Sequence, residues 1–136
     1  MVQVLLWIWQ FPQNLIGLII SYFSVSTEIY KIRNQNCFRC YVKNFPGAIS
    51  LGNYVILDYF TYHGYDHTKT KLHENGHQIQ SMYFGWFYLL LVGIPSICNN
   101  IWDRIFHSKW TYEKRSQWYY SRYPEKWADK LGGVKR

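Results

Sequence analysis

The sequence His73-Glu74-Asn75-Gly76-His77 places two histidines and a glutamate in the pattern H-E-x-x-H. Residues four apart lie on one face of an α-helix, so His73 and His77 can direct both imidazoles at a single metal ion. Glu74 lies about 100° around the helix from His73, within reach of a water molecule on that metal. The pattern predicts a helix that carries a metal site and a general base together. The alternative interpretation is a helix with two partly buried histidines and no metal.

A zinc site used for catalysis takes three protein ligands and leaves the fourth position to water, and H-E-x-x-H supplies only two. Residues 123–133, with the sequence YPEKWADKLGG, offer a third. Pro124 suits the first position of a helix and Gly132 suits its exit. Glu125 and Asp129 are four apart, so this predicted helix presents two carboxylates on one face. His107 is an alternative third ligand, although an exposed loop histidine is the favoured interpretation of that residue.

These two motifs resemble the gluzincin class of zinc metallopeptidases, in which a downstream helix carries E-x-x-x-D. The longer strings H-E-x-G-H-x-x-Q-S and E-K-W-A-D-K-L-G-G are also similar to a group of short bacterial predicted metallopeptidases. The resemblance implies that His73, His77 and Glu125 bind Zn²⁺. It implies that Glu74 is the catalytic base and that Asp129 orients His73. A ligating imidazole usually donates its other N–H to a carboxylate, which agrees with this assignment of Asp129.

The residues between the two histidines depart from the pattern of this superclass, which often has bulky apolar side chains there. This chain has Asn75 and Gly76 instead. A glycine inside a helix costs about 1 kcal/mol relative to alanine, so packing must hold the helix together. A close approach of another backbone at Gly76 would explain its use.

Residues 36–60 change from a helical to an extended pattern. The segments Cys37–Val42, Ala48–Leu51 and Tyr54–Phe60 are rich in strand-forming residues and are separated by turn sequences. They predict a small antiparallel sheet of two or three strands beside the H-E-x-x-H helix. The expected fold is therefore α+β, a compact zincin-like domain. In that class, the resemblance implies, such a strand offers its edge to an extended peptide substrate.

The composition of the 136 residues indicates one domain that works at an interface. Aromatic residues make up 21% and charged residues only 17%, which is low for a freely soluble surface. The net charge is +7, but the basic residues are scattered among Trp and Tyr. This distribution favours attraction to anionic lipid over nucleic acid binding.

Residues 2–25 contain no charged side chain and form an apolar segment. Its length suffices to cross a bilayer, which needs about 20 residues, but Gln10, Pro12, Gln13 and Asn14 interrupt it. It lacks the basic start and cleavage site of a secretory signal, so we expect residues 1–30 to form a retained hydrophobic anchor or interfacial helix before a zincin-like domain at 31–136. Basic residues follow it, which would place the chain after a span in the cytoplasm.

Residues 82–98 form a second apolar segment, directly after the predicted metal helix. It is short for a full crossing, so a buried core helix is the favoured interpretation. The alternative is a segment embedded in the membrane, which would bring the metal close to the membrane surface.

A hydrolase also needs a donor to the oxyanion of its tetrahedral intermediate. The sequence offers His107, Tyr112, Tyr119, Tyr120 and Tyr123 without choosing among them. The interpretation as a whole is a membrane-associated zinc metallopeptidase that acts on a peptide or protein substrate. One alternative is a non-catalytic membrane protein with a structural or regulatory metal site. Another is a zinc hydrolase that acts on non-peptide amides or lipids.

Overall fold

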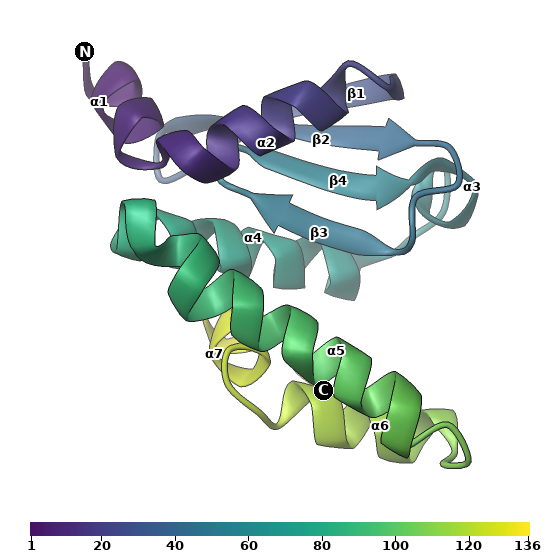
Figure 1. Cartoon of the computed structure of the whole chain (residues 1–136). Helices are drawn as coiled ribbons and strands as arrows, with labels where there is room; N and C mark the ends of the chain where they lie inside the picture. Colours follow the sequence, from purple (N-terminus) through teal and green to yellow (C-terminus); the bar gives the residue numbers. More distant parts are fainter.

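The computed structural model describes all 136 residues and shows an α+β architecture around a four-stranded sheet (Figure 1). This confirms the α+β class. The strands are β1 (Ser24–Ile32), β2 (Gln35–Val42), β3 (Ala48–Leu51) and β4 (Tyr54–Asp58). The helices are α1 (Val2–Trp9), α2 (Phe11–Ser21), α3 (Tyr59–Tyr62), α4 (Thr68–Phe84), α5 (Ile94–Phe106), α6 (Tyr112–Tyr120) and α7 (Glu125–Gly132). A 3-10 turn η1 (Gly85–Phe87) and a π-helical turn η2 (Leu89–Gly93) lie between α4 and α5.

The sheet is mixed, so the prediction of an antiparallel sheet is wrong in one respect. Its strand order is β1-β2-β4-β3, and β2 pairs with β4 in parallel. After β2 the chain crosses to β3 at the edge of the sheet. A tight turn at Gly52 then leads into β4, which lies between β2 and β3. Strand β1 was not predicted. It is an edge strand with mostly exposed side chains, so its sequence lacks an apolar pattern.

Helix α2 covers one face of the sheet, and α4 lies against the other (Figure 1). Side chains alternate along β4, as the period of a strand requires. Tyr54 and Ile56 join Cys40 in a cluster beneath α2, whereas Val55 and Leu57 join Tyr41 in a second cluster on the opposite face. The cysteines Cys37 and Cys40 are buried and form no disulfide.

The N-terminal apolar segment is a pair of helices rather than one, and α1 meets α2 at 93°. Three buried amides explain the bend, because each is hydrogen-bonded inside the protein. Gln13 Nε2 donates to Ser81 Oγ and to the Gly85 carbonyl, both at 2.9 Å, and Gln10 Oε1 accepts from Ser81 Oγ at 2.6 Å. Asn14 Oδ1 accepts from the Asn53 amide at 2.7 Å.

No helix of this chain is by itself long and apolar enough to cross a bilayer; by length and composition alone, only the bent pair α1 and α2 could. The expected domain boundary at residue 30 falls inside β1. Helix α2 packs on β3 and β4, so the N-terminal helices and the sheet share one core.

Residues 82–98 do not form a buried core helix, and that favoured interpretation is wrong. The segment contains the end of α4, η1, η2 and the start of α5. Within it only Gly85, Tyr88 and Val92 are buried. The chain turns at Gly85, which has a φ of 51° and lies against the indole of Trp9. Because the turns break the helix, most of its apolar side chains face outward.

Helices α4 and α7 approach each other closely at two glycines. A Cβ atom at Gly76 would collide with the Ala128 carbonyl, and one at Gly132 would collide with the Leu72 carbonyl. The close approach of a backbone at Gly76, expected from the sequence, is confirmed. Since backbone atoms cannot rotate away as a side chain can, neither glycine can be replaced without moving the helices apart.

We expect Gly76→Ala to lower the free energy of unfolding by about 3 kcal/mol, the upper range for overpacking, because the new methyl meets main-chain atoms of α7. Chemical denaturation of the metal-free protein measures this change. Gly93→Ala is the matched control, since a Cβ there meets nothing closer than 3.6 Å. This control should raise the free energy of unfolding by less than about 1 kcal/mol. Equal effects of the two substitutions would contradict the packing argument.

Candidate metal centre

Helix α4 presents a polar face to the interior of the protein. His73, Glu74 and His77 are buried, with exposed fractions of 4%, 6% and 5%. The helix runs unbroken through Gly76, as the sequence predicts. Buried titratable groups need partners, because desolvation disfavours an isolated charge. Helix α7 supplies Glu125 to both histidines and Asp129 to His73.

The side chains of His73, His77 and Glu125 converge on one point. His73 Nε2 and His77 Nε2 lie 2.9 and 3.0 Å from Glu125 Oε2, and 3.1 Å from each other. The sequence predicted this convergence. Ligands of tetrahedral zinc at 2.0–2.1 Å are about 3.3 Å apart, so a slight expansion of the triangle would accommodate an ion. This buried His-His-Glu cluster could hold a metal ion.

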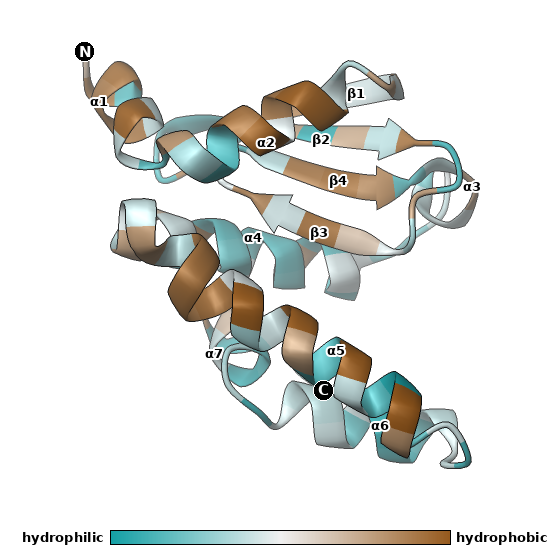
Figure 2. Cartoon of the chain, viewed as in Figure 1, coloured by the Kyte–Doolittle hydropathy of each residue, from teal (hydrophilic) through white to brown (hydrophobic).

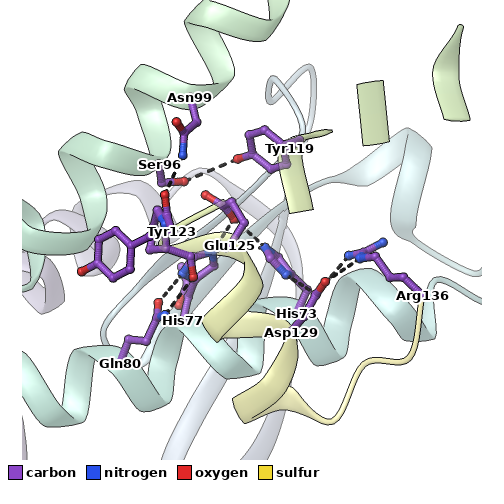
Figure 3. A network of polar contacts seen from close by, with 12 residues as sticks. His73, His77, Gln80, Ser96, Asn99, Tyr119, Tyr123, Glu125, Asp129 and Arg136 are labelled. Atoms are coloured by element: carbon purple, nitrogen blue, oxygen red, sulfur yellow. Dashed lines mark hydrogen bonds and ion pairs between the residues drawn. The ribbon is translucent and has the colours of Figure 1, made fainter. Parts of the chain in front are cut away.

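The outward nitrogen of each histidine is fixed by a further hydrogen bond (Figure 3). His73 Nδ1 donates to Asp129 Oδ1 at 2.7 Å, as expected from the E-x-x-x-D spacing. His77 Nδ1 donates to Gln80 Oε1 at 2.7 Å, and Gln80 Nε2 donates to the Pro124 carbonyl at 3.0 Å. Both histidines therefore turn Nε2 towards Glu125. Gln80 was not identified from the sequence, although it follows His77 by three positions on the same helix.

Arg136 holds Asp129 in place and was also missed by the sequence analysis. Its Nε donates to Asp129 Oδ2 at 2.6 Å and its Nη2 to Asp129 Oδ1 at 3.2 Å. The guanidinium lies 3.2 Å from the ring centre of Tyr120, whose ring in turn meets His73 edge-on at 5.1 Å. A bidentate pair of this kind restricts the orientation of the carboxylate. No local pattern in the sequence links residue 136 to residue 129.

The charges of the cluster depend on one another. Burial disfavours protonation of His73, but hydrogen bonds to Asp129 and Glu125 outweigh it and raise the pKa of His73 to about 9. Burial also opposes ionisation of Glu125, yet hydrogen bonds from the two histidines hold its pKa well below the usual range. In the absence of a metal, the cluster therefore keeps a proton on His73 between two ionised carboxylates.

At this site two buried carboxylate oxygens lack a hydrogen-bond partner: Glu125 Oε1 and Glu74 Oε2. Burial raises the pKa of Glu74. An unpaired oxygen on the residue that closes the His-His-Glu triangle fits a metal ligand, because a cation would compensate its desolvation. The donor set of two imidazoles and one carboxylate suits zinc.

A cavity of about 500 Å³ opens beside the cluster and is lined by His73, Glu74, His77 and Glu125. Residues Ala48–Leu51 of strand β3 form part of its wall. The cluster is therefore buried in its own helices but faces a cavity large enough for part of a peptide.

The candidate oxyanion donors divide into two groups. Tyr119 and Tyr120 line the cavity. Tyr123 does not line it, and its hydroxyl donates to the Leu91 carbonyl at 2.6 Å. His107 is also outside the cavity, stacked on Trp110 with the ring centres 3.8 Å apart.

The interpretation of His107 as an exposed loop residue is wrong, because it is 7% exposed at the end of α5. Its Nδ1 lies 3.2 Å from Asp103 Oδ1, and Arg115 Nη2 donates to Asp103 Oδ2 at 2.6 Å. The structure does not bring His107 to His73 and His77 as an alternative third ligand. Tyr112, a further donor candidate from the sequence, also lines the cavity. Tyr62 and Tyr88 line it as well and were not identified from the sequence as donors at this site. No protein family, curated protein or solved structure matches this chain.

We expect Asp129→Asn to weaken metal affinity by about 10 to 100-fold, because the amide cannot hold His73 as the carboxylate does. Competition with a chelating dye measures the affinity. Asp103→Asn is a close control, since Asp103 is likewise a buried carboxylate between a histidine and an arginine. That variant should bind metal as the wild type does. If both variants lose affinity equally, the effect is one of general stability.

Metal affinity should also depend on pH. A metal needs the neutral form of His73, whose pKa is raised from 6.5 to about 9, so binding at neutral pH releases a proton. The apparent affinity should rise about tenfold per pH unit from pH 7 and level off near pH 9. Dye competition at a series of pH values, corrected for the titration of the dye, measures this slope. An affinity that is constant between pH 7 and pH 9 would refute the proton release.

Proposed function

We propose that this protein is a metal-dependent hydrolase of the gluzincin type. More particularly, we propose a zinc metallopeptidase that works at a membrane surface. The observation that carries the proposal is the convergence of His73 Nε2, His77 Nε2 and Glu125 Oε2 within 3.1 Å of one another, beside an open cavity. The contact of Asp129 with His73 adds the orienting carboxylate expected of that class.

Glu74 is the proposed general base. It lines the same cavity as the three proposed ligands, and burial raises its pKa, which makes the carboxylate a stronger base. A bound zinc would acidify a water molecule and polarise the substrate carbonyl. Glu74 would take a proton from the attacking water and pass it to the departing amine. The hydroxyl then ends on the carbonyl carbon, giving a carboxylate and an amine as products.

A structural metal site is the first alternative, and the cavity argues against it. Structural zinc sites are usually closed by four protein ligands. Here three candidate ligands come together, and all three line the cavity. An accessible fourth position is what a reacting water requires.

Strand β3 favours a peptide over other amide or lipid substrates. It is one of the two edge strands of the sheet, and all four of its residues line the cavity. A peptide in extended form could lie along this edge and pair with its main-chain groups. Tyr119 and Tyr120 line the cavity and are the proposed donors to the oxyanion.

The proposed membrane association is supported by the absence of charged side chains from residues 1–27 and by the net charge of +7. Helices α1 and α2 meet at 93°, and the amides of Gln10 at the bend and of Gln13 and Asn14 in α2 are buried. This geometry favours a pair of helices that lie in the interface rather than a straight span.

We expect Glu74→Gln to keep the metal and to lower peptide hydrolysis by about 100-fold or more, because an amide cannot accept the proton at neutral pH. Elemental analysis of the purified protein gives the metal content, and mass spectrometry of a digested synthetic peptide library gives the activity. His77→Ala is the paired control and should lose the metal as well. A Glu74→Gln protein with full activity would remove Glu74 as the base, and a zinc-loaded wild type that cleaves no peptide would favour a structural metal.

A further inference from the structure

Two long stretches of the chain carry no charged side chain. Residues 1–27 and 75–102 contain none of the 8 acidic and none of the 15 lysine and arginine residues. These stretches form α1, α2, the second half of α4, η1, η2 and most of α5. A surface of a water-soluble protein normally mixes charges of both signs with its polar residues. The absence of charge is therefore the first observation to explain.

The fold brings the two stretches together. Trp9 Nε1 donates to the Met82 carbonyl, and Trp86 Nε1 donates to the Ile8 carbonyl, both at 2.9 Å. The rings of Phe11 and Trp86 lie 6.3 Å apart. Hydrophobic residues accordingly gather along α1, α2 and α5, whereas α4 is largely hydrophilic (Figure 2). We call the exposed apolar side chains of α1, α2, η1, η2 and α5 the uncharged surface.

Large side chains of this surface are well exposed. Leu5 is 61% exposed, Phe87 is 62% and Leu90 is 58%. Along α5, Ile101 and Ile105 are 51% and 62% exposed. Monomeric soluble proteins rarely show contiguous apolar patches of this kind, because each exposed side chain forfeits the gain from burial.

Helix α2 buries polar side chains and exposes apolar ones, the opposite of the usual arrangement in a surface helix. Its polar residues Gln13 and Asn14 are fully buried, and its apolar residues Leu15, Ile16 and Ile19 are exposed to 39%, 42% and 53%. A helix beside water would turn the other way. The interior accepts these amides because each finds hydrogen-bond partners there. An apolar neighbour outside the protein would account for the exposed side.

The cavity of the proposed active site opens at this surface. Ile16 of α2 and Ile94 and Ile97 of α5 line the cavity, and they are also exposed to 42%, 52% and 51%. The two helices thus supply apolar walls at its mouth.

We infer that the uncharged surface rests in the interfacial region of a bilayer that contains anionic lipid. Building on the proposed function, we infer that the substrates are apolar segments of membrane-bound proteins, which reach the metal from the lipid between α2 and α5. The net charge of +7, carried entirely outside the uncharged stretches, complements anionic headgroups. A segment that leaves the lipid must find partners for its main-chain groups, and the edge of β3 in the cavity wall supplies them.

Lipid contact can be measured on the full chain at Cys98. This residue is exposed on α5, whereas Cys37 and Cys40 are buried, so an environment-sensitive thiol label reports one position. Vesicles of phosphatidylcholine and phosphatidylglycerol should shift its emission to the blue, and brominated acyl chains should quench it. No shift and no quenching would overturn the inference, and a stable dimer under the same conditions would assign the surface to a second copy of the chain.

Paired substitutions separate insertion from electrostatic attraction. Ile101→Lys with Ile105→Lys adds two charges to the uncharged surface and should weaken vesicle binding about tenfold or more. Ser108→Lys with Gln117→Lys adds the same charge at exposed positions outside that surface. The second variant should bind as tightly as the wild type or more so. If both variants lose vesicle affinity equally, or both gain it equally, the inference is overturned.

Substrate delivery is tested with one peptide library made with and without an N-terminal palmitoyl chain. On vesicles, the metal-loaded wild type should cleave the palmitoylated peptides about tenfold faster than the free ones, since the lipid concentrates them at the cavity mouth. The variant with lysines at 101 and 105 should lose this preference and keep the rate on free peptides. Equal rates for the wild type would overturn delivery while leaving the peptidase intact. If the wild type cleaves neither form of the peptides, both the proposed function and the delivery of substrates from the lipid are refuted. The Cys98 signal would still decide whether the protein contacts lipid.

Discussion

The close contact between α4 and α7 is the constraint on which the site depends. With only a hydrogen at Gly76 and Gly132, main-chain carbonyls of each helix lie where a Cβ would otherwise stand. At this separation the first turn of α7 brings Glu125 onto both histidine rings, and Asp129 one turn later meets the far side of His73. Helix α4 alone carries two of the three candidate ligands. The glycine contact supplies the third and fixes the geometry of all three.

Hydrogen bonding alone does not make a metal site, and the protein contains its own comparison. His107, Asp103 and Arg115 form a buried histidine, carboxylate and arginine arrangement like that around His73. There the histidine stacks on a tryptophan, and no second imidazole or carboxylate approaches its other nitrogen. What distinguishes His73 is Glu125, which sits between two Nε2 atoms with one oxygen unpartnered. The hydrogen bonds orient the two histidines, and their convergence on Glu125 is what makes this cluster, unlike that of His107, a candidate metal site.

The sequence predicted the parts of the site that depend on local spacing. The helical positions of His73 and His77, the shared face of Glu125 and Asp129, and the close approach at Gly76 all follow from residues within a turn or two of each other. The parallel pairing of β2 with β4, the edge strand β1 and the contacts of Arg136 depend on distant parts of the chain. Propensity and periodicity do not encode such contacts, so these features were missed.

The polar residues at positions 10 to 14 show most clearly how context decides the meaning of a residue. In the amino-acid sequence they interrupt an apolar stretch and weaken its interpretation as a membrane span. In the structure Gln10, Gln13 and Asn14 are internal hydrogen-bonding groups that bend the segment and tie it to Ser81 and Asn53. Burying these amides inward turns the apolar side of α2 outward. The result is a polar interior around the proposed metal and an apolar exterior around the cavity mouth, an arrangement suited to a water-consuming reaction beside lipid.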